Sequence, residues 1–275
     1  MTLALVLGGG GIAGIAWHTG ILLGLVQSDS DPTVAEVLVG TSAGATVAAQ
    51  VGSGSDLAEL FRRQVDAGTR EAEIASPVSM TDLIGKLAPI FSGGYDAAER
   101  RRRLGALALA ADTVEEAERH RVIAARLDGL DWPDRRVDVV VVDAATGERR
   151  VFDRSSGVTM VDAVAASSAV PGVWPPVAIG GHRYVDGGVW SVTNTDLASG
   201  CDRVLVLAPI VDPALGVEVA GLGPDVRVEV IRPDAASLTA FGTDVLDLAV
   251  REPSARAGLV QGHAEAHRVR ELLAG

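Results

Sequence analysis

The sequence is poor in cysteine and lysine, and it has no excess of positive charge. Cys201 is the single cysteine among 275 residues, which excludes an intramolecular disulfide framework and a cysteine-based metal site. Lys86 is the only lysine, so nearly every positive charge is an arginine. With 36 acidic residues against 24 lysines and arginines, the chain lacks the basic surface of a nucleic-acid-binding protein, and no nucleic-acid partner is expected.

Charge is also absent from the first 28 residues, which contain no Asp, Glu, Lys or Arg. A signal peptide would need a basic segment there. A membrane span would need about 20 residues of continuous apolar sequence, and Gly8–Gly11 and Gly14 interrupt this one. We therefore expect neither an export signal nor a membrane anchor, and we predict a cytoplasmic protein. Peripheral contact with a membrane surface is left open.

Apolar runs in the first 51 residues alternate between strand and helix patterns. Leu3–Leu7 and Val37–Val39 are short apolar runs typical of strands buried on both faces, and each precedes a stretch with helical spacing. This order predicts an α/β fold with a mostly parallel sheet and right-handed crossovers. Further strands are expected at 137–142, 149–153, on both sides of Gly180–Gly181, at 203–207 and at 226–231, with closing helices near 238–250 and 254–273.

The region from residue 55 to 136 has a different composition. About one third of its residues are charged, against 22% for the chain, while leucine and alanine periodicity persists and β-branched runs are absent. We predict a helical cap over one edge or mouth of the sheet, within a single domain of residues 1–275. Arg100–Arg103 in this cap is expected to be a solvated helix turn, with contact to lipid phosphate as the alternative.

Gly40–Gly44 has the pattern G-x-S-x-G between an apolar strand and a helix, which is typical of a nucleophile elbow. Gly40 and Gly44 would allow the tight turn and the close approach of neighbouring backbone. Ser42 would lie at a helix N-terminus, where amide groups and the helix dipole favour negative charge. The alternative is a structural turn in which Ser42 only caps the helix.

The glycine run at residues 8–14 lies on the first strand-to-helix turn. From Gly9 to Gly14 it satisfies G-x-G-x-x-G, which also occurs in dinucleotide-binding loops. Such a fold presents an acid at the end of its second strand to bind the ribose, and here that strand ends in Gly40–Ser42. A P-loop is excluded because G-K-[ST] is absent. Two interpretations remain: an oxyanion hole made of backbone amides, or a tight turn without a ligand.

A serine nucleophile needs a base, and no histidine lies on a loop after a strand where hydrolase histidines normally project. His263 and His267 on the final helix are the candidates for a histidine-based triad. Asp186, followed by Gly187 and Gly188, ends an apolar strand, and a carboxylate that contacts a serine hydroxyl can act as the general base without an imidazole. An ordinary turn aspartate is the alternative.

Four blocks in this order resemble motifs of the patatin-like phospholipase family. They are the oxyanion-hole loop at Gly9–Gly14, the nucleophile elbow at Gly40–Gly44, a proline-bearing block at Ala166–Val177 and the D-G-[GA] motif at Asp186–Gly188. The resemblance spans about residues 3 to 200. It implies a three-layer α/β/α fold with a mostly parallel central sheet and a helical cap.

The resemblance also implies a serine acyl hydrolase that cleaves lipid esters, with phospholipid or lysophospholipid as the substrate. Ser42 would attack the ester carbonyl, Asp186 would accept its proton, and no metal or organic cofactor is required. The backbone amides of Gly9, Gly10 and Gly11 would bind the oxyanion. The remaining motif glycines are Gly14, Gly40, Gly44, Gly187 and Gly188.

One residue departs from the family pattern. Most members carry Arg or Lys one position before the last glycine of the loop, and here that position is Ala13. Loss of one oxyanion donor typically costs about 10² to 10³ in rate. The alternative function is therefore a catalytically weak or silent lipid-binding or regulatory member of the family.

Overall fold

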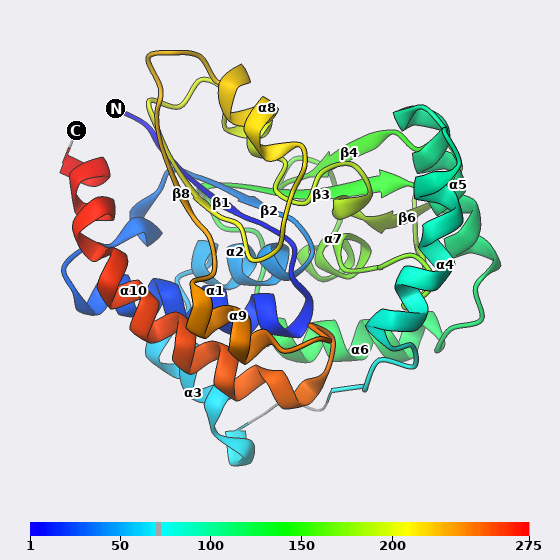
Figure 1. The fold of residues 1–275 in the computed structure, drawn as a ribbon, viewed down its shortest axis with the longest axis horizontal. Helices are drawn as coiled ribbons and strands as arrows, with labels where there is room; N and C mark the ends of the chain where they lie inside the picture. The colour runs from blue at the N-terminus through cyan, green and yellow to red at the C-terminus, as the bar shows by residue number, and fades with distance from the viewer. Residues whose placement is uncertain (70–72, 275) are drawn as a thin grey trace.

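The computed structural model describes residues 1–69 and 73–274 (Figure 1). Its eight-stranded sheet has the order β5-β6-β3-β2-β1-β7-β8, with β4 paired to β3. Neighbours from β3 to β8 in this order are parallel, whereas β4, β5 and β6 pair antiparallel. The predicted mostly parallel sheet is confirmed. The strands are β1 (Leu3–Leu7), β2 (Val37–Gly40), β3 (Arg136–Asp143), β4 (Arg149–Phe152), β5 (Val177–Ile179), β6 (His182–Asp186), β7 (Arg203–Leu207) and β8 (Arg227–Ile231).

Helices cover both faces of the sheet. The α-helices of the described residues are α1 (Gly11–Gln27), α2 (Ala43–Gly52), α3 (Leu57–Val65), α4 (Met80–Ser92), α5 (Ala97–Ala110), α6 (Glu116–Leu127), α7 (Met160–Ser167), α8 (Leu215–Gly221), α9 (Ala235–Phe241) and α10 (Arg251–Ala274). Helices α1, α2, α7 and α10 lie on one face and the short α8 on the other, as Figure 1 shows. The α/β/α layering follows from this arrangement.

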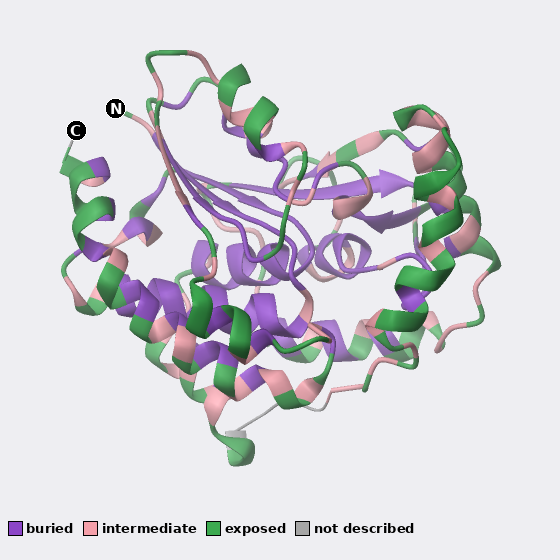
Figure 2. Ribbon diagram, viewed as in Figure 1, coloured by how far each residue is buried: buried purple, intermediate pink, exposed green. Residues whose placement is uncertain are grey.

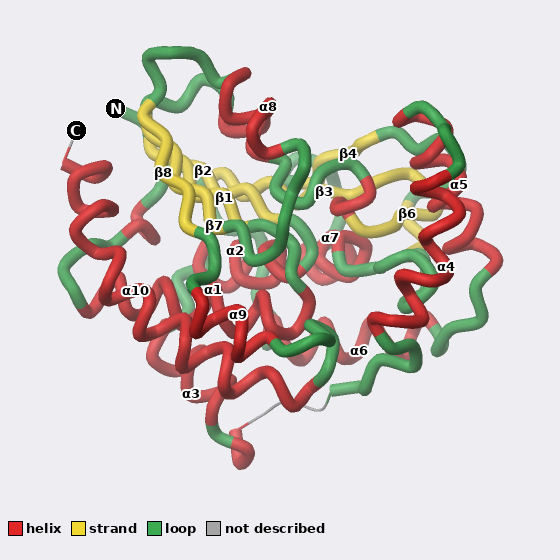
Figure 3. The backbone as a smooth tube through the Cα atoms, viewed as in Figure 1, coloured by secondary structure: helices red, strands yellow, loops and turns green. Residues whose placement is uncertain are grey.

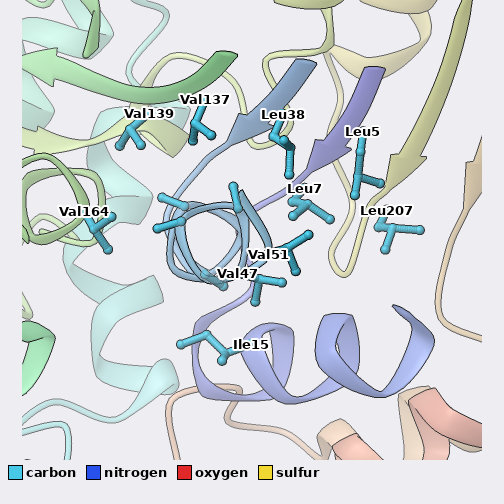
Figure 4. Close-up of a cluster of buried hydrophobic side chains, with 14 of the residues drawn as sticks. Leu5, Leu7, Ile15, Leu38, Val47, Val51, Val137, Val139, Val164 and Leu207 are labelled. Atoms are coloured by element: carbon cyan, nitrogen blue, oxygen red, sulfur yellow. The ribbon is translucent and has the colours of Figure 1, made fainter. Parts of the chain in front are cut away.

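The first strand is buried on both faces, as its apolar run predicts. Leu5 and Leu7 belong to the larger hydrophobic cluster on the α2 side, and Val6 to the smaller cluster on the α8 side. Figure 4 shows Leu5 and Leu7 on the side of the strand that faces α2, with Val47 and Val51 of α2 and Ile15 of α1 in the same cluster. The burial map in Figure 2 shows the same contrast between the buried strands and the largely exposed α4 and α5.

The uncharged start of the chain is explained by the close packing of α1 against α10. A Cβ atom on Gly258 of α10 would lie 2.6 Å from the Trp17 carbonyl oxygen, and one on Gly20 of α1 would overlap the Ala255 carbonyl oxygen. Glycines therefore let the two backbones touch, and nearly the whole of α1 is buried. None of the helices in the described ranges combines the length and apolar character needed to cross a membrane.

The region predicted as a cap contains helices α3 to α6, and its described residues contain no strand before β3 begins at Arg136. In Figure 3, α4 and α5 lie together near β6, beyond the end of the helical layer. Helix α3 packs against α1 and α10, and α6 packs against α7. Part of this charged region thus belongs to the layer beneath the sheet, and side chains such as Arg119 and Ile123 are buried there.

The helix expected near 238–250 is wrong in its bounds. Helix α9 begins after Asp234, whose side chain caps it, and ends at Phe241. Gly242 follows with φ +62°, in the left-handed region that ends a helix. Asp244 then accepts a hydrogen bond from the Leu246 amide at 2.9 Å and stabilises a turn. The apolar periodicity of residues 238–250 thus runs past the end of α9 into a turn, and periodicity alone did not show where the helix ends.

Candidate active site

Ser42 lies in the turn between β2 and α2, in a backbone conformation that serine rarely adopts. Its φ of 54° and ψ of −115° place it among the few non-glycine residues with positive φ. A Cβ on Gly40 would lie 2.6 Å from the Ala45 Cα, and one on Gly44 would overlap the Leu7 carbonyl oxygen. Both glycines are required by close backbone contacts, and the turn places Ser42 in the wall of a cavity.

Asp186 is the last residue of β6, and it lies in the same cavity as Ser42. Its Oδ1 accepts a hydrogen bond from the Gly188 amide at 2.7 Å, whereas Oδ2 forms no regular hydrogen bond with any described residue. Burial raises the pKa of Asp186 to about 6, against the opposing effects of the nearby Ser42 hydroxyl and the Gly188 amide. A Cβ on Gly187 would overlap the Val140 carbonyl oxygen, so glycine is required there.

The glycine-rich loop passes beside Ser42. A Cβ built on Gly9 would be 3.5 Å from the Ser42 Cβ. The amide of Gly9 donates to the Val192 carbonyl oxygen at 2.9 Å and is therefore occupied. The amides of Gly10 and Gly11, at the start of α1, donate to no other residue in the described ranges, and both glycines line the cavity. Two of the three expected amides are thus free to bind an oxyanion.

Ala13, which stands where a cation was expected, is completely buried. Its amide donates to the Val245 carbonyl oxygen at 3.1 Å, and a Cβ on Gly11 would lie 2.7 Å from that same oxygen. A Cβ on Gly14 would lie 3.1 Å from the Ala43 Cβ, so α1 and α2 pack tightly here. The loop is braced by backbone contacts with a distant segment, and a charged side chain at position 13 would begin from a fully buried site.

Ser42 and Asp186 line an apolar cavity of about 340 Å³ together with the glycine loop. Helices α4 and α5 supply much of its wall through Met80, Leu83, Leu87, Phe91 and Leu104. Ser42 also lines a second, much smaller cavity of about 30 Å³, whose wall includes Arg119, Arg126, Ser168 and Trp174. Ser42 therefore lies where an apolar chamber meets a smaller one that contains arginines.

All five histidines lie in the described ranges, and none lines either cavity. His18 is fully buried with Nε2 2.9 Å from the Gly8 carbonyl oxygen, and burial lowers its pKa to about 4. His263, on α10, bonds to Ser28, and His267, also on α10, pairs with Glu271. His120 and His182 bond to Asp162 and Asp143, respectively. The arrangement does not favour a histidine-based triad.

The described residues include no group of three or more His, Cys, Asp or Glu side chains that could hold a metal ion. Cys201 is a buried free thiol just before β7. Sequence reasoning missed Ser167, Arg119 and Ser168 as residues of the site. Ser167 and Ser168 fell inside the proline-bearing block, and Arg119 fell in a region whose charge indicated solvent exposure.

Comparisons with known proteins agree with the motifs. A family model described as patatin-like phospholipase matches residues 5–199, which is more than half of the chain. No curated protein sequence gives a significant match. Similar solved structures include VipD from Legionella pneumophila, at 13% identity and a TM-score of 0.47, and the type III effector protein ExoU, at 17% and 0.45.

Each structural alignment covers 98% of this chain, but only 66% of the VipD chain and 53% of the ExoU chain. The family model therefore carries the assignment, and it includes both the elbow at Gly40–Gly44 and the motif at Asp186–Gly188. The chain belongs to the patatin-like phospholipase family.

Proposed function

We propose that this chain hydrolyses carboxylic ester bonds of phospholipids or lysophospholipids through a Ser42–Asp186 dyad. The observation that carries the proposal is the meeting of three groups at one apolar cavity: a serine in a strained turn, a buried carboxylate and two free amides. A buried carboxylate with a raised pKa is suited to general-base work near neutral pH. The apolar wall of the cavity suits an acyl chain.

In the proposed reaction, Ser42 Oγ attacks the ester carbonyl carbon while its proton moves to Asp186 Oδ2. The amides of Gly10 and Gly11 donate hydrogen bonds to the tetrahedral oxyanion. The bond to the alcohol then breaks, and the alcohol leaves with the proton from Asp186. Water attacks the acyl-serine, Asp186 takes one of its protons, and collapse returns that proton to Ser42 and releases the fatty acid. Gly9 contributes space beside Ser42 in this scheme, since its own amide is occupied.

The test is hydrolysis of a lysophospholipid and a monoacylglycerol by the wild type and by Ser42→Ala and Asp186→Asn. We expect both variants to lose hydrolysis while their circular dichroism stays native. Hydrolysis that persists in both would overturn the dyad. Ala13 suggested a catalytically silent protein as the alternative. A fluorophosphonate probe distinguishes the two functions, because an active enzyme is labelled at Ser42 and a silent but folded protein is not.

We also propose peripheral contact with a lipid surface through α4. Ile84 and Phe91 are 59% and 55% exposed, and Phe91 also lines the apolar cavity. Exposed apolar side chains beside an acyl-binding chamber would place its entrance at the lipid. We expect Ile84→Ser to weaken sedimentation with neutral phosphatidylcholine vesicles, with Val217→Ser, an exposed apolar site on α8, as the control. Equal sedimentation of the two variants would overturn this contact.

A further inference from the structure

The smaller cavity beside Ser42 contains an arginine without an anionic partner. Arg119, on α6, is only 6% exposed, and its Nε and Nη1 atoms are buried without a hydrogen bond to any described residue. Its guanidinium group stacks on the Trp174 ring, 3.9 Å from the centroid. Stacking orients the planar group, but it satisfies none of its N–H donors, and burying them unpaired is unfavourable.

The nearby acid cannot supply the missing partner. Glu73 accepts hydrogen bonds from Arg126 Nε and Nη2, both at 2.7 Å, and forms an ion pair with Arg251 at 3.0 Å. Burial and then the positive charge of Arg126 lower the pKa of Arg119 to about 9, against the opposing charge of Glu73, so the group remains charged at neutral pH. A buried cation next to a second cation is an arrangement that an incoming anion would stabilise.

A second donor without a partner lies in the same cavity. The Ser168 hydroxyl, directly after α7, is buried and forms no hydrogen bond with any described residue. Ser168 and Arg119 come from different elements, yet both line the cavity that contains Ser42. The nucleophile thus stands between unpaired donors on one side and the apolar chamber on the other.

We propose that Arg119 and Ser168 form a phosphate-binding subsite that selects acyl esters with a phosphate group close to the scissile bond. This inference rests on the proposed ester hydrolysis. A guanidinium edge presents two N–H donors that match two phosphate oxygens, and a serine hydroxyl can donate a hydrogen bond to a third oxygen. The acyl chain occupies the apolar chamber while the phosphate of the lipid occupies the smaller cavity.

The kinetic test compares 1-octanoylglycerol 3-phosphate with 1-octanoylglycerol, both below their critical micelle concentrations. We expect the wild type to prefer the phosphate ester by about tenfold or more in kcat/KM, and Arg119→Gln to lower that preference by about tenfold, chiefly through KM. Ser168→Ala should lower it less, and Arg119→Lys should keep part of it. Arg121→Gln removes an exposed arginine from the same helix and should keep the full preference.

An unchanged preference in Arg119→Gln, with hydrolysis still dependent on Ser42, would overturn the subsite and leave the proposed function standing. If no ester is hydrolysed, the proposed function fails, and binding then decides the subsite. Calorimetry with Ser42→Ala should show octyl phosphate binding more tightly than inorganic phosphate, and Ser42→Ala/Arg119→Gln should lose this binding. Equal affinity for octyl phosphate and inorganic phosphate would contradict the proposal that the bound phosphate belongs to a lipid. Binding of neither ligand would overturn the subsite.

Discussion

The hydroxyl group of Ser167 joins the Ser42 backbone to the central sheet. Its oxygen accepts a hydrogen bond from the Ser42 amide at 2.9 Å and donates one to the Val140 carbonyl oxygen of β3 at 2.6 Å. Ser167 is completely buried, so neither group could find water if the hydroxyl were removed. The strained turn at the nucleophile is therefore held by a side chain from α7.

We expect Ser167→Ala to lower the free energy of unfolding by about 1–3 kcal/mol, because it leaves two buried polar groups unpaired. It should also lower kcat, since the conformation of Ser42 loses its support. Urea denaturation and ester hydrolysis measure the two effects. The neighbouring Ser168→Ala removes a hydroxyl without a partner, so it should change stability by less than about 0.5 kcal/mol. Equal destabilisation by the two variants would contradict the bridging role of Ser167.

The proposed base predicts the pH dependence of activity. Asp186 must be ionised to accept the Ser42 proton, and burial raises its pKa to about 6. We expect kcat/KM for an uncharged ester to be level above pH 7 and to fall about tenfold per pH unit below 6. A stopped assay from pH 4.5 to 8.5 measures the profile. An inflection near the ordinary aspartate value of 3.8 would contradict the effect of burial.

The raised pKa of Asp186 also predicts that ionisation of its carboxyl group destabilises the folded protein. The pKa of Asp186 is higher in the folded than in the unfolded chain. Its contribution to folding stability is therefore fully present below pH 3.8 and is lost as the pH rises through about 6. Asp186→Asn removes that loss. We expect this variant to exceed the wild type in unfolding free energy by up to about 3 kcal/mol at pH 8 and by little at pH 4. A difference that does not depend on pH, in urea titrations at both values, would contradict this.

The elbow predicts a contrast between two glycine substitutions. Gly44→Ala would drive a Cβ into the Leu7 carbonyl oxygen, so we expect a loss of about 3 kcal/mol or more in stability, or no folded protein. Gly216→Ala, in α8, adds a Cβ that meets nothing within 4 Å and should be neutral or stabilising by about 1 kcal/mol. Thermal unfolding measures both. A stable Gly44→Ala protein would contradict the close contact.

The sequence predicted the local parts of the site, because positions that require glycine can be recognised directly in the sequence. Gly40 and Gly44 are required by the turn that positions Ser42, and the apolar run of β1 follows from burial on both faces. The occupied amide of Gly9 was not predictable, since its partner is the carbonyl group of Val192, far along the chain. Spacing alone cannot tell a free amide from an occupied one.

Burial of charged residues was the other property that the sequence did not indicate. Arg119 lies on a helix rich in charge, where the pattern is typical of a solvated surface, yet α6 packs against α7 and encloses it. The solvated turn expected at Arg100–Arg103 is only partly correct. Arg102 and Arg103 are exposed and pair with Glu99, whereas Arg101 is half-buried, donates to the Gly147 carbonyl oxygen at 2.9 Å and stacks on the Trp190 ring. Only the tertiary arrangement distinguishes the two kinds of arginine.

The glycine contacts between α1 and α10 connect the far end of the chain to the glycine-rich loop beside Ser42. Helix α10 lies beyond residues 5–199, where the family model matches, yet its Gly258 and Gly262 touch the backbone of the helix that begins at this loop. Amide protons of α1 and α10 should therefore exchange as one cooperative unit. A fragment that stops at residue 199 would retain every motif of the family and lose the support that holds the first of them in place.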